Sequence, residues 1–438
     1  QVEKKAEKTP EGARYPLQAR CAQLARMGCV VFHYDMVGYA DSQAIGHGAF
    51  ADVEAEMRLQ NLMGLQTWNS IRALDFLTEL PEVDSRRIGV TGASGGGTQT
   101  FILCAIDERP AAAFPAVMVS TEMQGGCVCE NCSLLRIGTG NVEFAGLFAP
   151  KPLAMSAAND WTLNIEKQGY PQLKSLYRML QAEDQVKARC WPEFDHNYNQ
   201  PAREMMYNWF NKHLSLGLAD PVSEKPFVPV PPKQLSVFDA DHPRPGDSAN
   251  ATKLREYLTR ISRQQLEQIK PTDAPGLQAY QSILRPALRA MLCDQLPQAA
   301  EVESREVSRF MRDDHEVTGL ILGRKGSKEE VPGLFLRGKV EGGPVILWVD
   351  PAGKAGLFSG DSLRPEARSL LQRAGGILAL DVFGTGELTP AKAMQLNTKF
   401  AGYTLGYNRP LLAQRVHDLL TGVGYLRGRG GVGSVRIL

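Results

Sequence analysis

The chain has 438 residues, and this length suggests roughly two or three domains. Its 49 Lys and Arg balance 48 Asp and Glu, so the formal net charge is only +1. A dedicated nucleic-acid binder would carry a basic surplus, which argues against that class of partner. No apolar run reaches the ~18 residues that cross a bilayer, and we expect no membrane span.

The two ends qualify this description. The chain begins at Gln1 and stops in the apolar run Val435–Leu438, which is typical of a strand. We expect both ends to be truncations of a longer parent, so the sequence assigns no compartment. It assigns no oligomeric state either. Eight cysteines in so long a chain do not indicate a disulfide scaffold.

In chain order, the first half alternates helices and strands. Helical spacing over Tyr15–Met27 ends at Gly28, and a buried strand is expected at Cys29–Phe32. A long helix is expected over Asp52–Leu80, followed by a strand at Arg87–Thr91. Further elements are a helix through Ile106, strands at Ala113–Val119, Pro152–Ala157 and Val186–Trp191, and a helix at Pro201–His213. This alternation predicts an α/β fold with a doubly wound, mostly parallel sheet.

The second half begins with a change in composition. Prolines crowd residues 220–245, which predicts an extended connector, and helices are expected at Thr252–Ile269 and Gly276–Leu296. The later elements are strands at Glu301–Phe310, Glu316–Leu322, Gly333–Arg337, Val345–Val349 and Gly376–Asp381, with a helix at Pro365–Arg373. We therefore divide the chain into domains at 1–218, 219–300 and 301–438.

The third part repeats the first. Leu24–Val31 aligns with Leu371–Leu378, and Arg87-Ile88 aligns with Arg436-Ile437. A long match in consistent order indicates duplication, although two helix–strand units can resemble each other by chance. The alignment predicts two copies of one α/β unit, each of them incomplete. The second copy stops before the segment that follows residue 91 in the first copy.

That segment, Gly92-Ala93-Ser94-Gly95-Gly96, is the one Gly-x-Ser-x-Gly in the chain. A sharp strand-to-helix turn exposes the Ser hydroxyl, and small flanking residues permit the turn. The Gly95 N–H at the helix start can stabilise an oxyanion. The alternatives are a Gly-rich turn with a bystander Ser, or a phosphate cradle. We interpret Ser94 as a nucleophile.

A nucleophilic Ser needs an acid and a base, in the chain order Ser, Asp or Glu, His. Asp160 and His196 each follow a predicted strand, at the same sheet edge as Ser94. Asp160 could instead be a helix N-cap, and His196 a surface-loop residue. Asp195 is a rival acid, but its side chain diverges from that of its neighbour. His33 and His47 precede the Ser.

Residues 15–214 resemble the α/β-hydrolase superfamily, and its acetyl xylan esterase and dienelactone-hydrolase-like branch in particular. The resemblance rests on Phe32–Gly38, Arg87–Gly96, Ala149–Pro152 with Asp160, and Asp195-His196. It implies ester hydrolysis through an acyl-Ser intermediate without a cofactor. Ser94 would attack, His196 would transfer the proton, and Asp160 would hold the imidazole.

The chain departs from the superfamily in one respect. Members supply a second oxyanion N–H from the loop after an early strand, and residues 1–14 contain no such strand. The second copy keeps the equivalent segment, Val345–Val349 followed by Asp350–Gly353, but not the Ser-bearing turn. The source of the second oxyanion donor and the role of the second copy stay open.

Three thiols, Cys127, Cys129 and Cys132, lie within six residues. A structural zinc site requires a fourth ligand, and no second CxxC or HxxxH partner appears, so we expect no metal. The simplest interpretation is a cap loop near the mouth of the pocket. His417, on a predicted helix face, is expected to pack and not to catalyse.

The leading hypothesis is a serine carboxylesterase that deacetylates a carbohydrate or another small ester. A prolyl-oligopeptidase-like peptidase would share the triad, but no propeller-like repeat precedes this domain. A tandem scaffold with a non-catalytic second copy is the third possibility. The acyl and alcohol parts of the substrate are not specified by the sequence.

Overall fold

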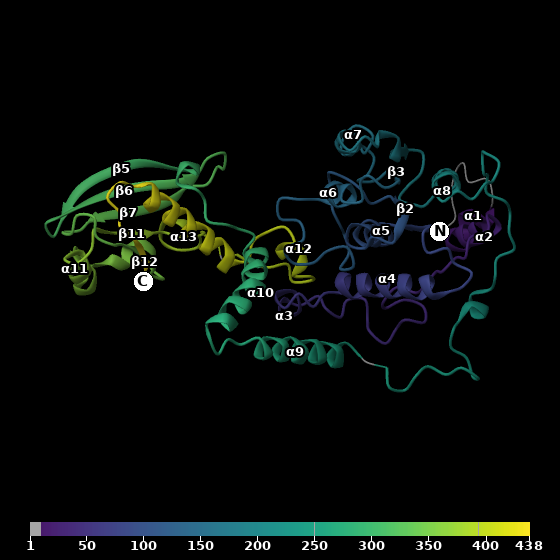
Figure 1. Cartoon of the computed structure of the whole chain (residues 1–438), viewed down its shortest axis with the longest axis horizontal. Helices are drawn as coiled ribbons and strands as arrows, with labels where there is room; N and C mark the ends of the chain where they lie inside the picture. The colour runs from purple at the N-terminus through teal and green to yellow at the C-terminus, as the bar shows by residue number, and fades with distance from the viewer. Residues whose placement is uncertain (1–9, 249, 393) are drawn as a thin grey trace. The chain divides into compact units, whose positions relative to one another are not determined.

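The computed structural model describes residues 10–248, 250–392 and 394–438. The chain forms two compact units (Figure 1). Unit 1 comprises Gln1–Gln265 and Asn397–Tyr407, and unit 2 comprises Leu266–Leu396 and Asn408–Leu438. The division at residues 218 and 300 stays a prediction, and the start of its first domain lies outside the described residues.

Unit 1 is built on a parallel sheet with the strand order β1-β2-β3-β4. The strands are β1 (Ile88–Ala93), β2 (Pro110–Ala116), β3 (Leu153–Ala158) and β4 (Val186–Trp191). The helices are α1 (Pro10–Arg14), α2 (Pro16–Arg26), α3 (Val53–Met57), α4 (Leu62–Glu79), α5 (Gly95–Ile106), α6 (Asn141–Gly146), α7 (Tyr170–Met179), α8 (Gln200–His213), α9 (Ala251–Gln268, which extends into unit 2) and α12 (Gly402–Leu405). The predicted parallel α/β architecture is confirmed for this unit.

Both faces of this sheet are covered. Along β3, Leu153 and Met155 pack into one cluster with Phe101 of α5, whereas Ala154 packs into a second cluster with Met206 of α8. Successive strand residues point to opposite faces, so burial of all six β3 residues requires a layer on each side. The doubly wound arrangement brings the carboxyl ends of the four strands to one edge.

The predicted long helix over 52–80 is wrong in one respect, because it is interrupted. Asp52 caps α3 by accepting from the Ala55 N–H, and Asn61 caps α4 by accepting from the Gly64 N–H. Between the two helices, Leu59 has a φ of +55°. A second N-cap side chain within the pattern starts a new helix there.

The strand predicted at Cys29–Phe32 is also wrong. These residues have no regular secondary structure, and Val30 and Phe32 are 48% and 44% exposed. Among the described strands of this sheet, β1 is an edge strand whose partner is β2. An apolar run becomes a strand only where a neighbouring strand shares its backbone hydrogen bonds, and residues 29–32 pair with none of the described strands.

The Pro-rich connector belongs to unit 1 and bonds to it at several places, for example from the Lys225 N–H to Gln23 and from the Val230 N–H to Gln18. Arg203 of α8 forms a bidentate ion pair with Glu224, at 2.7 Å for both contacts, and the Tyr207 hydroxyl donates to the same carboxylate. Arg203 is fully buried and the Glu224 side chain is 1% exposed. The connector therefore contributes a buried charge to the unit.

Unit 2 has a mixed sheet with the strand order β12-β8-β11-β7-β6-β5. Its strands are β5 (Val302–Arg312), β6 (His315–Arg324), β7 (Val331–Arg337), β8 (Val345–Trp348), β11 (Gly376–Leu380) and β12 (Val435–Ile437), with the small pair β9 (Phe358–Ser359) and β10 (Ser362–Leu363); its helices are α10 (Ala274–Leu292), α11 (Pro365–Leu371) and α13 (Leu411–Gly428). The pairs β11–β8 and β8–β12 are parallel, whereas β5, β6, β7 and β11 pair antiparallel. The expectation of a mostly parallel sheet is wrong here, because Asp313 and Asp314, both with positive φ, close a tight β5–β6 hairpin.

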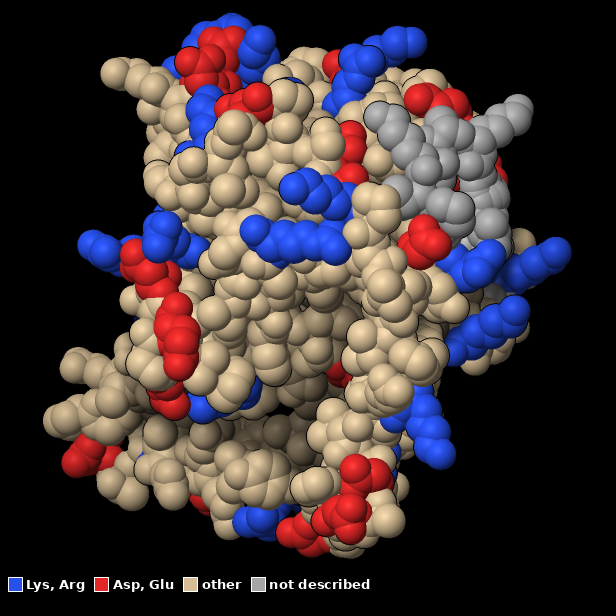
Figure 2. All heavy atoms as spheres, turned by 90° about the vertical axis from the view of Figure 1, so that its right-hand side faces the viewer, with Lys and Arg blue, Asp and Glu red and all other residues tan. Residues whose placement is uncertain are grey.

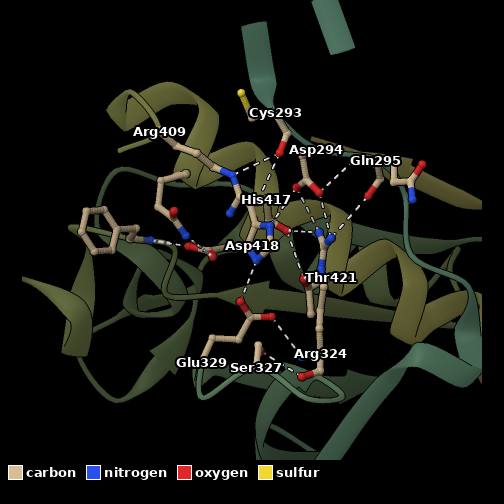
Figure 3. A network of polar contacts seen from close by, with 12 residues as sticks. Cys293, Asp294, Gln295, Arg324, Ser327, Glu329, Arg409, His417, Asp418 and Thr421 are labelled. Atoms are coloured by element: carbon tan, nitrogen blue, oxygen red, sulfur yellow. Dashed lines mark hydrogen bonds and ion pairs between the residues drawn. The ribbon is translucent and has the colours of Figure 1, made fainter. Parts of the chain in front are cut away.

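His417 of α13 is at the centre of a buried polar network in unit 2 (Figure 3). Its Nδ1 lies 2.8 Å from Asp294 and its Nε2 lies 2.7 Å from Glu329. Arg324 pairs with Asp294 at 2.8 and 3.1 Å. The network ties the segment after α10 to β6 and α13, and the packing role expected for this His stays a prediction.

The face shown in Figure 2 carries Lys and Arg side chains intermixed with Asp and Glu, separated by wide neutral areas. It shows no basic stripe of the kind that tracks a phosphate backbone. None of the described helices is long and apolar enough to cross a membrane.

Candidate functional site

Ser94 stands at the turn between β1 and α5. Its φ is +56° and its ψ is −123°, a backbone conformation that L-residues rarely adopt. A Cβ on Gly92 would lie 2.4 Å from the Gly96 carbonyl oxygen, but a Cβ on Gly96 would meet open space. Of the two outer glycines in the motif, only Gly92 is therefore required on steric grounds.

Gly95 begins α5, where the first backbone N–H groups of a helix have no partner within the helix. A Cβ added to Gly95 would lie 3.0 Å from the Cys129 Sγ. The loop that carries Cys127, Cys129 and Cys132 is therefore in contact with the start of this helix. The geometry agrees with the predicted use of the Gly95 N–H as an oxyanion donor. That role remains a prediction.

The structure brings Asp160 and His196 together. Asp160 follows β3 and His196 follows β4, and the Asp160 Oδ2 lies 2.7 Å from the His196 Nδ1. The Asp160 Oδ1 accepts from the backbone N–H and the hydroxyl of Thr162, at 2.7 and 2.5 Å. Burial alone would raise the pKa of Asp160, but the hydrogen bonds from His196 and Thr162 hold it below its ordinary value. A stable carboxylate thus faces the imidazole.

The imidazole itself is partly open to solvent. The His196 side chain is 33% exposed, whereas that of Asp160 is 5% exposed. The Trp161 ring packs on the imidazole with centroids 4.5 Å apart. Within the described residues, no hydrogen bond joins the Ser94 Oγ to His196, so the contact needed for proton transfer is not formed in this state.

Glu130 is a second carboxylate at this site, and no motif in the sequence pointed to it. Its Oε1 lies 3.5 Å from the Cβ position of Gly95, and it interacts electrostatically with His196. Burial raises its pKa even though the N–H groups of Gly126 and Cys127 donate to its carboxylate. Glu130 therefore lies near both the turn and the base without a direct hydrogen bond to His196.

A cavity of about 810 Å³ opens beside Ser94. Its walls come from residues 28–36, from β1, from the face of α4 and from the loop at 127–130. The irregular segment 29–32 thus forms a wall of the cavity. Another hollow, of about 940 Å³, lies along α7 and β4 and includes none of the predicted site residues.

A segment from the second half of the chain holds the loop that faces this cavity. The Leu134 N–H donates to Leu405 and the Arg136 N–H donates to Gly406, both at 2.8 Å. The Tyr403 hydroxyl donates to the Gly126 carbonyl oxygen at 2.6 Å. Residues 397–407 therefore belong to the site's support, a role that no local pattern indicated.

Residues 11–129, about a quarter of the chain, match the family model described as glucuronyl esterase, fungi. The matched region includes Ser94 and ends at Cys129. No curated protein sequence matches the chain. The acetyl xylan esterase branch expected from the sequence is not the family that this match names.

Three solved structures illustrate the similarity. Methylesterase BT1017 aligns at 27% identity with a TM-score of 0.48, over 59% of this chain and 58% of that one. A carbohydrate esterase family 15 glucuronoyl esterase from Caldicellulosiruptor kristjansonii aligns at 18% identity and TM-score 0.31, over 42% and 57%. The glucuronoyl esterase catalytic domain from Hypocrea jecorina aligns at 15% and 0.31, over 45% and 66%. The chain spans less than two thirds of each.

Proposed function

We propose that unit 1 is the catalytic domain of a serine ester hydrolase of the α/β-hydrolase type that acts on a carbohydrate ester. The observation that carries the proposal is the 2.7 Å contact between Asp160 and His196 at the sheet edge where Ser94 occupies a strained strand-to-helix turn. The glucuronyl esterase match over residues 11–129 supports it independently.

In this mechanism the Ser94 Oγ attacks the ester carbonyl carbon while the His196 Nε2 accepts the hydroxyl proton. Asp160 keeps the other imidazole proton on Nδ1, so that Nε2 presents its lone pair. The tetrahedral intermediate then collapses, and His196 gives the proton to the departing alcohol. Water, activated by the same imidazole, hydrolyses the acyl-Ser94 ester and regenerates the enzyme.

The oxyanion of each tetrahedral intermediate would lie against the start of α5. The Gly95 N–H is the first donor that we assign there, because it belongs to the first turn of the helix. A second donor typically contributes a factor of ~10²–10³ in rate. Its source in this chain is left unassigned.

For the substrate we propose an ester of a uronic-acid carboxyl group, in place of the acetyl ester expected first. In such an ester the sugar lies on the acyl side, so Ser94 becomes esterified by the sugar and releases the alcohol. The cavity of about 810 Å³ beside Ser94 is within the size range of small-ligand sites. The proposal rests on the family match and not on the cavity.

We also propose that unit 2 is a second hydrolase-like copy without catalytic function. Its strands β11, β8 and β12 are parallel neighbours, and the segments Leu371–Leu378 and Arg436-Ile437 align with the first copy. Among the residues given, the one Gly-x-Ser-x-Gly segment lies at residues 92–96, in unit 1. On this proposal, all esterase activity of the chain depends on Ser94.

The proposal is tested by labelling the full chain with a fluorophosphonate and mapping the modified peptide. We expect one adduct, on Ser94, and none in Ser94→Ala. Hydrolysis of methyl glucuronate, p-nitrophenyl acetate and a Pro-anilide is then compared by kcat/KM. The uronate ester is expected to be the best substrate.

Each other outcome has a defined meaning. A folded protein that forms no adduct on Ser94 would refute the esterase assignment. Preference for the acetate would restore the deacetylase hypothesis, and cleavage of the anilide would indicate the peptidase. Activity that persists in Ser94→Ala would show that the nucleophile lies elsewhere and that unit 2 is not inert.

A further inference from the structure

Two thiols and an imidazole meet at the rim of the cavity. One nitrogen of His47 and the sulfur atoms of Cys127 and Cys129 all lie within 4.8 Å of one another. The His47 Nε2 is 3.2 Å from the Cys127 Sγ, although the two residues are 80 positions apart in the chain. The esterase mechanism makes no use of this cluster.

His47 is held in the manner of a metal ligand. Its Nδ1 lies 2.9 Å from the Val37 carbonyl oxygen, which accepts the Nδ1 proton and leaves the Nε2 lone pair directed at the sulfur. The Tyr39 ring contacts the imidazole edge-on, with centroids 4.8 Å apart. Gly38, with a φ of +90°, lets the chain pass close to the His47 backbone. The imidazole orientation is thus fixed without a metal.

The two thiols are held equally firmly. The Gly126 and Cys127 N–H groups donate to Glu130 at 2.7 and 3.0 Å, which closes a tight loop around the Cys-x-Cys segment. Cys129 is 8% exposed and packs on Gly95. Thiolates are the form in which cysteine binds metals.

We propose that His47, Cys127 and Cys129 bind one zinc ion, with the fourth position open to the cavity. Sulfur and nitrogen are the donors that zinc prefers, whereas Mg²⁺ and Ca²⁺ take oxygen. Tetrahedral zinc places a thiolate and an imidazole nitrogen about 3.6 Å apart and two thiolates about 3.8 Å apart. The His47 Nε2 and Cys127 Sγ, at 3.2 Å, are slightly closer than that value, and all three ligand atoms lie within 4.8 Å of one another, so small side-chain shifts suffice.

The ion would join the turn at 37–47 to the loop at 126–130, two walls of the cavity beside Ser94. We expected no metal from the sequence because no fourth ligand for the three thiols appears in it. The fold brings His47, which precedes the Ser-bearing turn, to two of these thiols, whereas Cys132 is not part of the cluster. The described residues add no fourth protein ligand to the group, which agrees with an open and not a closed site.

The test is a titration of the reduced, metal-free full chain with Co²⁺, which reports thiolate ligation by its charge-transfer absorption. We expect one equivalent to bind and to be displaced by Zn²⁺. His47→Ala and Cys127→Ser should weaken Co²⁺ binding by roughly 100-fold or more. Cys29→Ser is the matched control, because Cys29 lines the same cavity outside the cluster and this variant should bind as the wild type does.

Circular dichroism of each variant first establishes that it is folded. No charge-transfer absorption in the folded, reduced wild type would overturn the proposal. Binding that survives both His47→Ala and Cys127→Ser would overturn it as well, as would an equal loss in Cys29→Ser. The metal site does not depend on the esterase assignment, since fluorophosphonate labelling of Ser94 is a separate readout.

Discussion

Replacement of Asp160 by Asn tests the geometry of the proposed triad most directly. The Thr162 N–H and hydroxyl both donate to the Asp160 Oδ1, so the Asn side chain must turn its oxygen toward Thr162. Its NH₂ group then points at the His196 Nδ1, which is 2.7 Å from the carboxylate in the native chain. An amide donor there stabilises the tautomer with its proton on Nε2, and that imidazole cannot accept the Ser94 proton.

The expected loss in kcat is about 10⁴-fold, or about 5 kcal/mol of transition-state stabilisation. The side chain of Asp160 is only 5% exposed, so water cannot restore the lost interaction. The assay is kcat and KM on methyl glucuronate, with the rate of Ser94 modification by a fluorophosphonate as an independent measure. KM should change far less than kcat, because Asp160 orients the base and does not hold the substrate.

Glu130→Gln is the matched control. Glu130 influences His196 electrostatically but makes no hydrogen bond to it in the described residues, so we expect a loss of less than about tenfold. A loss in Glu130→Gln as large as that in Asp160→Asn would refute the assignment of Asp160 as the orienting acid. A loss below tenfold in Asp160→Asn would refute the whole argument from the 2.7 Å contact.

Three further predictions follow from other features. Glu224→Gln leaves the buried guanidinium of Arg203 without a counter-charge and should lower the free energy of unfolding by about 3–5 kcal/mol. The loss is measured as a fall in Tm, followed by tryptophan fluorescence. The control is Glu183→Gln, in an exposed ion pair, which should leave Tm unchanged. Gly92→Ala should abolish Ser94 labelling because its Cβ would collide with backbone, whereas Gly96→Ala should keep it; equal labelling of both variants would contradict the clash. Burial raises the pKa of Asp294, but the hydrogen bonds from Arg324 outweigh it and hold the pKa below its ordinary value. The Asp294 carboxylate therefore stabilises the fold at any pH above the ordinary aspartate pKa. This stabilisation is lost as the pH falls through the lower pKa that Asp294 has in the folded chain. Asp294→Asn should therefore lower Tm at pH 7 and lower it less at pH 3, and calorimetry showing the opposite order would contradict this.

The sequence predicted the elements whose signals are local. Proline at the start and Gly28 at the end define α2, and β4 lies over the predicted Val186–Trp191. The order of Ser94, Asp160 and His196 along an alternating α/β pattern predicts a site at one sheet edge, and Asp160 and His196 are in contact there, but the roles of the three residues stay predictions. The predictions of these elements succeed because cap residues and hydrophobic period are properties of short segments.

Other features depend on tertiary structure alone. Residues 29–32 are apolar enough for a strand, but whether they form one depends on a hydrogen-bonding neighbour, which spacing does not specify. The pairing of His47 with Cys127 across 80 positions, and of Tyr403 with Gly126 across 277, is likewise invisible in a linear pattern. Sequence by itself therefore determined the type of fold and the residues of the proposed triad. Only the folded chain decided what surrounds them, because contacts between distant segments are set by how the elements pack and not by any one of them.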